Sequence, residues 1–173
     1  TYTVLPDEGY YLTGVNVDVN VEGGGKVVLP NGTKFRTSSF STLPEGCDFS
    51  QITNFEYMFY DCTSLTTIPQ LDTSNGTNFR GMFYNCTSLT EVPQLDFSKG
   101  TDFRQMFVSC TALKTMNTLN ISNGSMFSGM FSSCSALENI TFEGSINYGI
   151  DFSHCTKLTY ASVESILTAC AAT

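Results

Sequence analysis

The sequence predicts an α/β solenoid of 24-residue coils, each with a short helix and a short strand, and three observations support this fold class. First, one phrase occurs in four near-identical copies, which begin at Phe55, Phe79, Phe103 and Phe127. Second, the cysteine of each copy follows the preceding one by 24 residues. Third, each copy combines apolar residues at helical spacing with an extended segment. A fixed period of about 20 to 50 residues is typical of solenoids.

Residues 1–25 differ from the repeats, and we expect them to form a small β element that connects the array to a larger polypeptide. Valine alternates with polar residues from Val15 to Val21, which predicts a half-buried strand. Three glycines at residues 23–25 then predict a flexible joint. The chain begins without Met or a signal-peptide core, so we expect it to be part of a longer protein.

Residues 26–54 are predicted to be a degenerate first repeat that acts as an N-terminal cap. Terminal repeats are atypical because they must end the stack without exposing its core. Residues 26–29 and 34–36 flank the pair Asn31-Gly32, a pattern that predicts a β-hairpin. The second half of this segment parallels the extended part of the full repeats, with one extra residue.

The leucine-rich repeats are expected at residues 55–158, each with a helical half and an extended half. In the helical half, four apolar residues fall at positions i, i+3, i+4 and i+7, as do Phe79, Met82, Phe83 and Cys86. This spacing predicts a helix of about two turns. In the extended half of the same copy, three residues are expected to point inward: Leu89, Val92 and Leu95. A short helix and a short strand per repeat make a coil of the leucine-rich-repeat type.

Proline limits the length of the expected strands. Pro69 and Pro93 lie within the extended halves of the first two full repeats. Proline has no N–H and cannot donate to a sheet ladder. We therefore expect strands of about three or four residues, which is shorter than usual.

The C-terminal residues 159–173 are predicted to form a capping helix. Ser162 is a suitable N-cap residue, because its hydroxyl can accept a hydrogen bond from the first turn. Apolar residues then recur at i, i+3, i+4 and i+7, which predicts a buried face made of Val163, Ile166, Leu167 and Cys170.

The seven cysteines admit two interpretations. An odd number in a small secreted protein could mean a disulfide framework with one thiol left over. The regular spacing favours a ladder of buried thiols, because equivalent residues of successive coils stack on one another. We expect this structural ladder to consist of Cys62, Cys86, Cys110, Cys134 and Cys155. Zinc is less favoured, since the sequence has no CxxC or CxxH pair.

The charge balance argues against nucleic acid and membrane partners. The formal net charge is −8, and the chain has only 8 Lys and Arg residues. A protein that binds nucleic acids or anionic lipids needs clustered basic residues. No apolar run approaches the roughly 20 residues that cross a bilayer, so we expect no membrane insertion. A polar, weakly charged surface suits an extracellular or virion protein.

Two residue sets could carry chemistry, and we expect neither to do so. Ser153 and Cys155 flank the single histidine, His154, but adjacent residues rarely point at each other, so His154 is expected at the surface of the last coil. A second set lies in one column and is followed two residues later by serine: Asp48, Asp72, Asp96 and Asn120. Stacked carboxylates could bind calcium, but Asn120 fits an Asx turn better. The sequence therefore predicts no catalytic residue, no metal and no cofactor.

The repeat phrase resembles a known family. Met-Phe-x-x-Cys-x-x-Leu-x-x-Ile/Val-Pro-x-Leu-Asp-x-Ser is similar to the BspA-like leucine-rich repeats of bacterial surface proteins, over roughly residues 40–160. The resemblance implies attachment at the cell surface, adhesion to a host matrix, and no catalytic residues. The segments at residues 2–10 and 15–21 resemble connectors of gut bacterial and phage tail proteins. This second resemblance implies a phage virion as an alternative location.

The candidate binding surface consists of polar positions on the extended halves, because solenoids use extended repeat faces for recognition. The residues are Thr67, Gln70, Glu91, Gln94, Thr115, Thr118 and Asn139, with Phe97 as a possible exposed aromatic anchor. They are neutral to acidic, so we expect an extracellular protein or glycan with hydrogen-bond donors or mild positive charge. The alternative is a structural or receptor-binding segment of a phage tail. An enzyme would need a cleft near His154.

Overall fold

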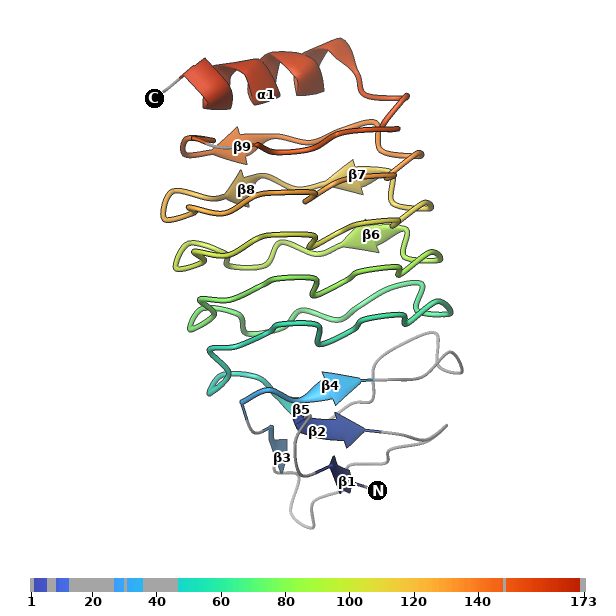
Figure 1. Cartoon of the computed structure of the whole chain (residues 1–173), viewed down its shortest axis with the longest axis vertical. Helices are drawn as coiled ribbons and strands as arrows, with labels where there is room; N and C mark the ends of the chain where they lie inside the picture. Colours follow the sequence, from blue (N-terminus) through green and yellow to red (C-terminus); the bar gives the residue numbers. More distant parts are fainter. Residues whose placement is uncertain are drawn as a thin grey trace.

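The molecule is an elongated stack of coils. The computed structural model describes residues 2–5, 9–12, 27–29, 31–35, 47–147 and 149–171. Figure 1 shows the N-terminal strands at one end of the stack and a helix at the other. The strand expected from Val15 to Val21 and the glycine joint at residues 23–25 lie outside the described residues.

Five short strands form the N-terminal end. Strand β1 (Tyr2–Leu5) pairs antiparallel with β2 (Gly9–Leu12), and β2 pairs in parallel with β4 (Lys34–Phe35). Strand β3 (Val27–Val28) pairs in parallel with β5 (Cys47–Asp48). The hairpin predicted across the Asn-Gly turn is therefore wrong, because β3 and β4 pair with other strands and not with each other.

The Asn-Gly turn is instead a corner of a coil. The side-chain oxygen of Asn31 accepts the N–H groups of Thr53 and Asn54, at 3.1 and 2.8 Å. The Phe35 ring stacks on the ring of Phe59, 24 residues later, with centroids 5.1 Å apart. Residues 31–35 thus lie in register with the first full repeat.

The extended halves of the later repeats pair in parallel. Strand β6 (Glu91–Val92) pairs with β7 (Thr115–Met116), and β8 (Leu119–Asn120) pairs with β9 (Phe142–Glu143). Partners such as Glu91 and Thr115 lie 24 residues apart, so each circuit of the chain returns to the same place one coil further on. Each of these strands has two residues, which is shorter than the three or four expected.

The helix predicted for the first half of each repeat is wrong, because the described repeats form consecutive β-turns there. In the second copy, the N–H of Met82 donates to the Phe79 carbonyl and that of Cys86 to the Phe83 carbonyl, at 3.2 and 3.1 Å. These bonds span three residues, whereas an α-helix needs bonds that span four. Residues at i, i+3, i+4 and i+7 also share one side of two successive turns, and all four of these residues are buried.

Positive φ angles shape these turns. The third residue of the two turns is Gly81 (φ 57°) and Asn85 (φ 58°). This is the position of a type II turn that favours glycine and asparagine. Other copies place Tyr57, Gln105 and Ser109 in the same conformation, with φ of 53°, 58° and 58°. The left-handed conformation costs about 1–2 kcal/mol for a residue with a Cβ atom.

Alternate N–H groups of the turn half bond to the next coil. Three alternate residues of the second copy donate to carbonyl oxygens of the third at 2.8–2.9 Å: Phe79 to Asp102, Gly81 to Arg104, and Phe83 to Met106. A helix would direct these N–H groups along its own axis and leave the carbonyls of the neighbouring coil without donors. Consecutive turns satisfy both coils at once, so stacking favours turns over a helix.

Stacked phenylalanine rings form the centre of the core. The first Phe of each copy stacks on that of the next, with centroids 5.3–5.8 Å apart, and the second Phe does the same at 5.3–5.4 Å. The corner glycine makes room for these rings. A Cβ atom on Gly100 would lie 2.3 Å from the Phe103 ring, so packing requires glycine at this corner.

The cysteines stack beside the rings as hydrogen-bond donors. Each of the five ladder thiols donates to the second Phe carbonyl of the preceding coil, as Cys110 does to Phe83 at 3.1 Å. The same bond is made at 3.0–3.2 Å by Cys62, Cys86, Cys134 and Cys155. The Phe83 carbonyl also accepts the N–H of Cys86. The Cys110 thiol therefore bonds to the second lone pair of this carbonyl oxygen. Burial raises the pKa of Cys110 to about 12, which keeps the donor proton in place at neutral pH.

The seven cysteines all lie within the described residues and are free thiols. The ladder thiol at the C-terminal end differs from the others. Cys155 is half-buried, and its interaction with the neighbouring Cys134 side chain lowers the pKa of Cys155 and raises the pKa of Cys134.

Helix α1 (Tyr160–Ala171) covers the last coil, as Figure 1 shows. The prediction of Ser162 as N-cap is wrong, because Ser162 lies inside the helix and its N–H bonds to Thr159 Oγ1 at 3.4 Å. The buried Ser162 hydroxyl donates to the Glu138 carbonyl and accepts the N–H of Ile140, both at 3.0 Å. It therefore ties the helix to the last full repeat. Among the described residues, no helix is long and apolar enough to span a bilayer.

The predicted buried face of α1 is also largely wrong. Val163 and Leu167 are 40% and 63% exposed, and Cys170 is exposed. Ile166 alone of the four packs against the core, and the fully buried residues of the helix are Ser162 and Ala169. The small side chains of Ser162 and Ala169 allow the helix to lie close to the last full repeat, and Ser162 bonds to its N–H and carbonyl groups.

Replacing Cys86 by Ala should lower the free energy of unfolding by about 1–3 kcal/mol, because the Phe59 carbonyl loses a donor and a small cavity remains. Urea unfolding followed by circular dichroism measures this change. Exposed Cys170→Ala is the matched control and should change the free energy by less than about 0.5 kcal/mol. Equal effects of the two substitutions would contradict a stabilising thiol ladder.

Replacing Ser109 by Asn should raise the free energy of unfolding by about 0.5–1 kcal/mol. Ser109 has φ 58°, a conformation that asparagine tolerates and that Asn85 adopts at the equivalent position. Ser109→Val should have the opposite effect, because a β-branched residue is strained at positive φ. A thermal melt of the three proteins tests the order, and a Val variant as stable as the Asn variant would refute it.

Candidate functional site

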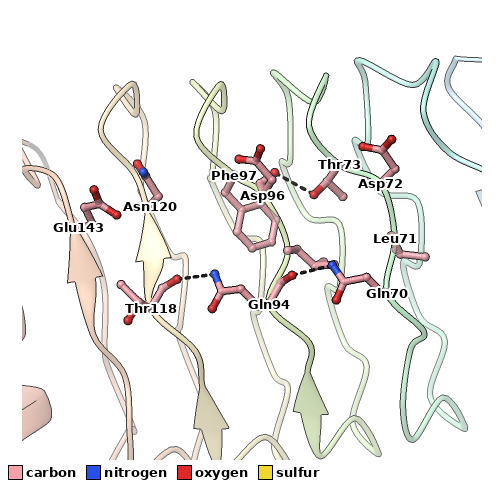
Figure 2. A pocket seen from close by; sticks show the side chains of 11 residues that line it. Gln70, Leu71, Asp72, Thr73, Gln94, Asp96, Phe97, Thr118, Asn120 and Glu143 are labelled. Carbon is pink, nitrogen blue, oxygen red and sulfur yellow. Dashed lines mark hydrogen bonds between the residues drawn. The ribbon is translucent and has the colours of Figure 1, made fainter.

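An open groove of about 700 Å³ runs along the stack on the side of the extended halves. Figure 2 shows two rows of side chains that follow the long axis of the molecule. One row, here called the acidic rim, consists of Asp72, Asp96, Asn120 and Glu143. The other, here called the amide rim, consists of Gln70, Gln94 and Thr118. Each rim takes one residue from each successive coil.

Asx turns position the acidic rim. The N–H of Ser98 donates to Asp96 Oδ1 at 2.9 Å, and the equivalent bonds to Asp72 and Asn120 measure 3.1 Å. These bonds confirm the predicted turns. A hydrogen bond from the Ser98 side chain, with that from its N–H, holds the pKa of Asp96 below its usual value, so the carboxylate is charged at neutral pH. Glu143 stands next to Asn120 in the parallel pair of β8 and β9.

Hydrogen bonds along the stack position the amide rim. Gln70 Nε2 donates to the carbonyl of Gln94 at 2.6 Å, and Gln94 Nε2 donates to the carbonyl of Thr118 at 3.0 Å. In the next coil the equivalent carbonyl, that of Thr141, accepts the backbone N–H of Leu119 at 2.9 Å. The glutamine side chains therefore take the place of this backbone donor in the earlier coils, and Gln70 and Gln94 are both exposed.

Buried residues form the floor between the rims. Leu71 and Leu95 are 3% and 2% exposed, and the Thr73 hydroxyl donates to the carbonyl of Asp96 at 2.8 Å. The expectation that Phe97 is an exposed anchor is wrong. Its ring is 2% exposed and packs edge-on against Phe79, with centroids 4.9 Å apart. Phe97 therefore belongs to the core beneath the groove.

The other residues of the candidate surface lie outside the groove lining. Glu91 pairs with Thr115, which is bridged to Asn139, so these three exposed residues form a row of their own across three coils. Thr67 is half-buried. Sequence reasoning placed Gln70, Gln94 and Thr118 on the binding surface, and the structure brings them together in the amide rim.

Sequence reasoning missed the acidic rim as a partner-binding surface, because it interpreted Asp72, Asp96 and Asn120 as turn formers, with calcium binding as the less favoured alternative. A period-two signal could have found it. Gln94 and Asp96 flank the buried Leu95, and alternate residues of an extended segment point to the same side. Glu143 carries a weaker signal, because its repeat departs from the phrase there.

His154 occupies a turn position and lies outside this groove. It is exposed with φ 65°, and the preceding copy has Ser133 with φ 63° at the equivalent place. The neighbouring Ser153 N–H closes an Asx turn on Asp151 at 2.7 Å. Among the described residues, no group of three or more His, Cys, Asp or Glu side chains is placed to hold a metal ion.

Comparison with known proteins places the chain in a family. A family model described as "Mycoplasma protein of unknown function, DUF285" matches residues 33–143, which is more than half of the chain. The chain belongs to the DUF285 family. The match begins in the first coil and ends at Glu143, so the DUF285 region contains the whole groove.

Among solved structures, the DUF285 chain is similar to a leucine-rich-repeat protein of T. pallidum. The identity is 18%, the match covers 98% of this chain and 92% of that one, and the TM-score is 0.40. A comparison with curated proteins finds no match.

Stability should fall as the pH is lowered through the acid range. Hydrogen bonds from Ser98 and Ser153 hold the pKa values of Asp96 and Asp151 below the usual range. Each carboxylate thus contributes stability above the ordinary pKa of about 3.9 and loses it as the pH falls through the lowered folded pKa. Thermal melts between about pH 6 and pH 3 measure the effect. Asp96→Asn should reduce the dependence, and an unchanged pH profile would contradict the role of Asp96.

Proposed function

We propose that this DUF285 protein is a non-catalytic binding module of a bacterial surface protein, which mediates adhesion to a host protein or to another extracellular protein or glycan. The proposal also assigns its coils to the leucine-rich-repeat type, because the repeat phrase resembles the BspA-like repeats. It also includes an extracellular location at the bacterial surface and membership of a larger polypeptide.

One observation carries the proposal: a groove crosses successive coils, and its rims vary from copy to copy while the core does not. The amide rim changes from Gln70 and Gln94 to Thr118, and the acidic rim changes from aspartate to Asn120 and Glu143. The buried Phe, Met, Phe and Cys positions are identical in all four copies. A repeated core supports a rigid scaffold, and variable rim residues on such a scaffold favour recognition of a partner that spans several coils.

The absence of catalysis is part of this proposal and rests on the placement of the candidate residues. His154 is exposed in a turn, and the buried ladder thiols hold their protons as donors to backbone carbonyls. A nucleophile needs a thiolate or an adjacent base, and the raised pKa values of Cys86 and Cys110 oppose the first at those two thiols.

A phage or prophage tail segment is the alternative function. The resemblance of residues 2–10 and 15–21 to tail connectors favours it. The sequence of the full-length parent gene would distinguish the tail segment from the surface adhesin. Tail-assembly regions upstream would support the virion segment, whereas a signal peptide and a cell-wall anchor would support the surface adhesin.

The binding test uses the full chain, a panel of immobilised extracellular-matrix proteins and a panel of glycans. Gln94→Lys together with Glu91→Lys should weaken the strongest interaction at least about tenfold, because lysine replaces neutral and acidic groups across two rows of the face. Glu164→Lys on helix α1 also replaces an acidic group by lysine but lies outside the groove lining, so it should have no effect. Equal loss in both variants, or an unchanged affinity in the double variant, would contradict binding at this face.

A further inference from the structure

The two rims of the groove offer acceptors to a ligand. The acidic rim carries three carboxylates, and among the described residues the Glu143 carboxylate makes no hydrogen bond or ion pair. On the amide rim, one N–H of Gln70 and one of Gln94 are engaged along the stack, and among the described residues neither side-chain oxygen accepts a hydrogen bond. Because the carboxylates can only accept, the two rims together favour a ligand that brings donors.

The charge of the groove indicates which charge the ligand should carry. Lys99 acts on the Asp96 carboxylate, and its Nζ donates to Asn75 Oδ1 at 2.9 Å, in the corner that follows Asp96. One lysine against Asp72, Asp96 and Glu143 leaves the site acidic. The chain as a whole has net charge −8, which disfavours a second copy of itself as the occupant. Charge complementarity thus favours a basic partner.

The spacing of the carboxylates defines the shape of this partner. Asp72 and Asp96 belong to adjacent coils, about 4.8 Å apart, so one cationic group can bond to both. Glu143 lies two coils beyond Asp96 (Figure 2). The midpoint of the first pair is therefore about 12 Å from Glu143. In an extended chain, residues i and i+4 share one side and lie about 13 Å apart.

We propose that the groove binds an extended protein segment with two basic side chains four residues apart. One basic group bonds to Asp72 and Asp96, and the other bonds to Glu143. Backbone N–H groups of the segment donate to Gln70 and Gln94 on the opposite rim. The aliphatic stem of the first basic residue lies over the floor of Leu71 and Leu95. This inference rests on the proposed function and names the partner class for the same face.

The test titrates the full ¹⁵N-labelled chain with the peptide Thr-Lys-Thr-Thr-Thr-Lys-Thr, capped at both ends. Chemical shifts should change at the rim residues, including the side-chain amides of Gln70, Gln94 and Asn120. A peptide with both lysines replaced by glutamine should bind at least about tenfold more weakly. A peptide of the same composition with adjacent lysines should bind at least about threefold more weakly, because neighbouring side chains of an extended chain point to opposite faces.

Variants of the chain complete the test. Asp96→Asn removes a charge and keeps the turn, since Asn120 makes the same bond to the N–H of Ser122. Asp96→Asn and Glu143→Gln should each weaken the lysine peptide at least about threefold, and Glu164→Gln on α1 should leave it unchanged. Equal binding of the glutamine peptide, or equal binding to all variants, would overturn the proposal.

The outcomes also separate this inference from the proposed function. If the chain binds a matrix protein or glycan through the groove but gives no lysine-dependent shifts, the partner class is wrong and the binding module stands. If the peptide binds in the groove but groove variants leave matrix and glycan binding unchanged, the partner class stands and the proposed adhesion at this face fails.

Discussion

Every coil must find partners for its backbone groups in the coils above and below it, and the rest of the structure depends on this constraint. The turn half meets it by dividing its N–H groups. Alternate donors close turns within the coil, and the others reach carbonyls of the next coil, as from Phe83 to Met106. The division requires a positive φ at fixed positions, which explains Gly81 and Asn85. It also brings the phenylalanines into columns with ring centroids less than 6 Å apart.

Side chains complete the backbone ladder where the main chain cannot. Thiols reach a second lone pair of the Phe carbonyls, glutamine amides take the place of a backbone donor, and threonine hydroxyls such as that of Thr101 bond to the carbonyl of Thr77 at 3.1 Å. A weakly charged sequence rich in Ser, Thr, Asn and Cys therefore has a structural cause. The same bonds also serve the groove, because they hold the amide rim in place and leave its oxygens for a partner.

The core and the groove were predictable to different degrees, and particular residues show why. The buried columns follow from a strict repeat, since identical residues in every copy stack on one another. Phe97 replaces Thr73 and Ile121 in its column, and variation there suggested an exposed anchor. The ring is instead buried, because the floor beneath the groove accepts side chains of different size between Phe79 and Phe103. The acidic rim was predictable as a series of turns. Its position across the groove from the amide rim depends on the three-dimensional path of the backbone in each coil.

The sequence by itself determined the period, the buried columns, the Asx turns and the acidic character of the surface, because all of these follow from residue type and spacing. Only the tertiary structure decided between helix and consecutive turns, since both patterns bury positions i, i+3, i+4 and i+7. Consecutive turns are favoured because the neighbouring coil supplies hydrogen-bond partners that a helix cannot use. The tertiary structure likewise decided which side of α1 is buried. The last coil offers backbone groups to bond, and the small residues Ser162 and Ala169 approach them more closely than Leu167 could.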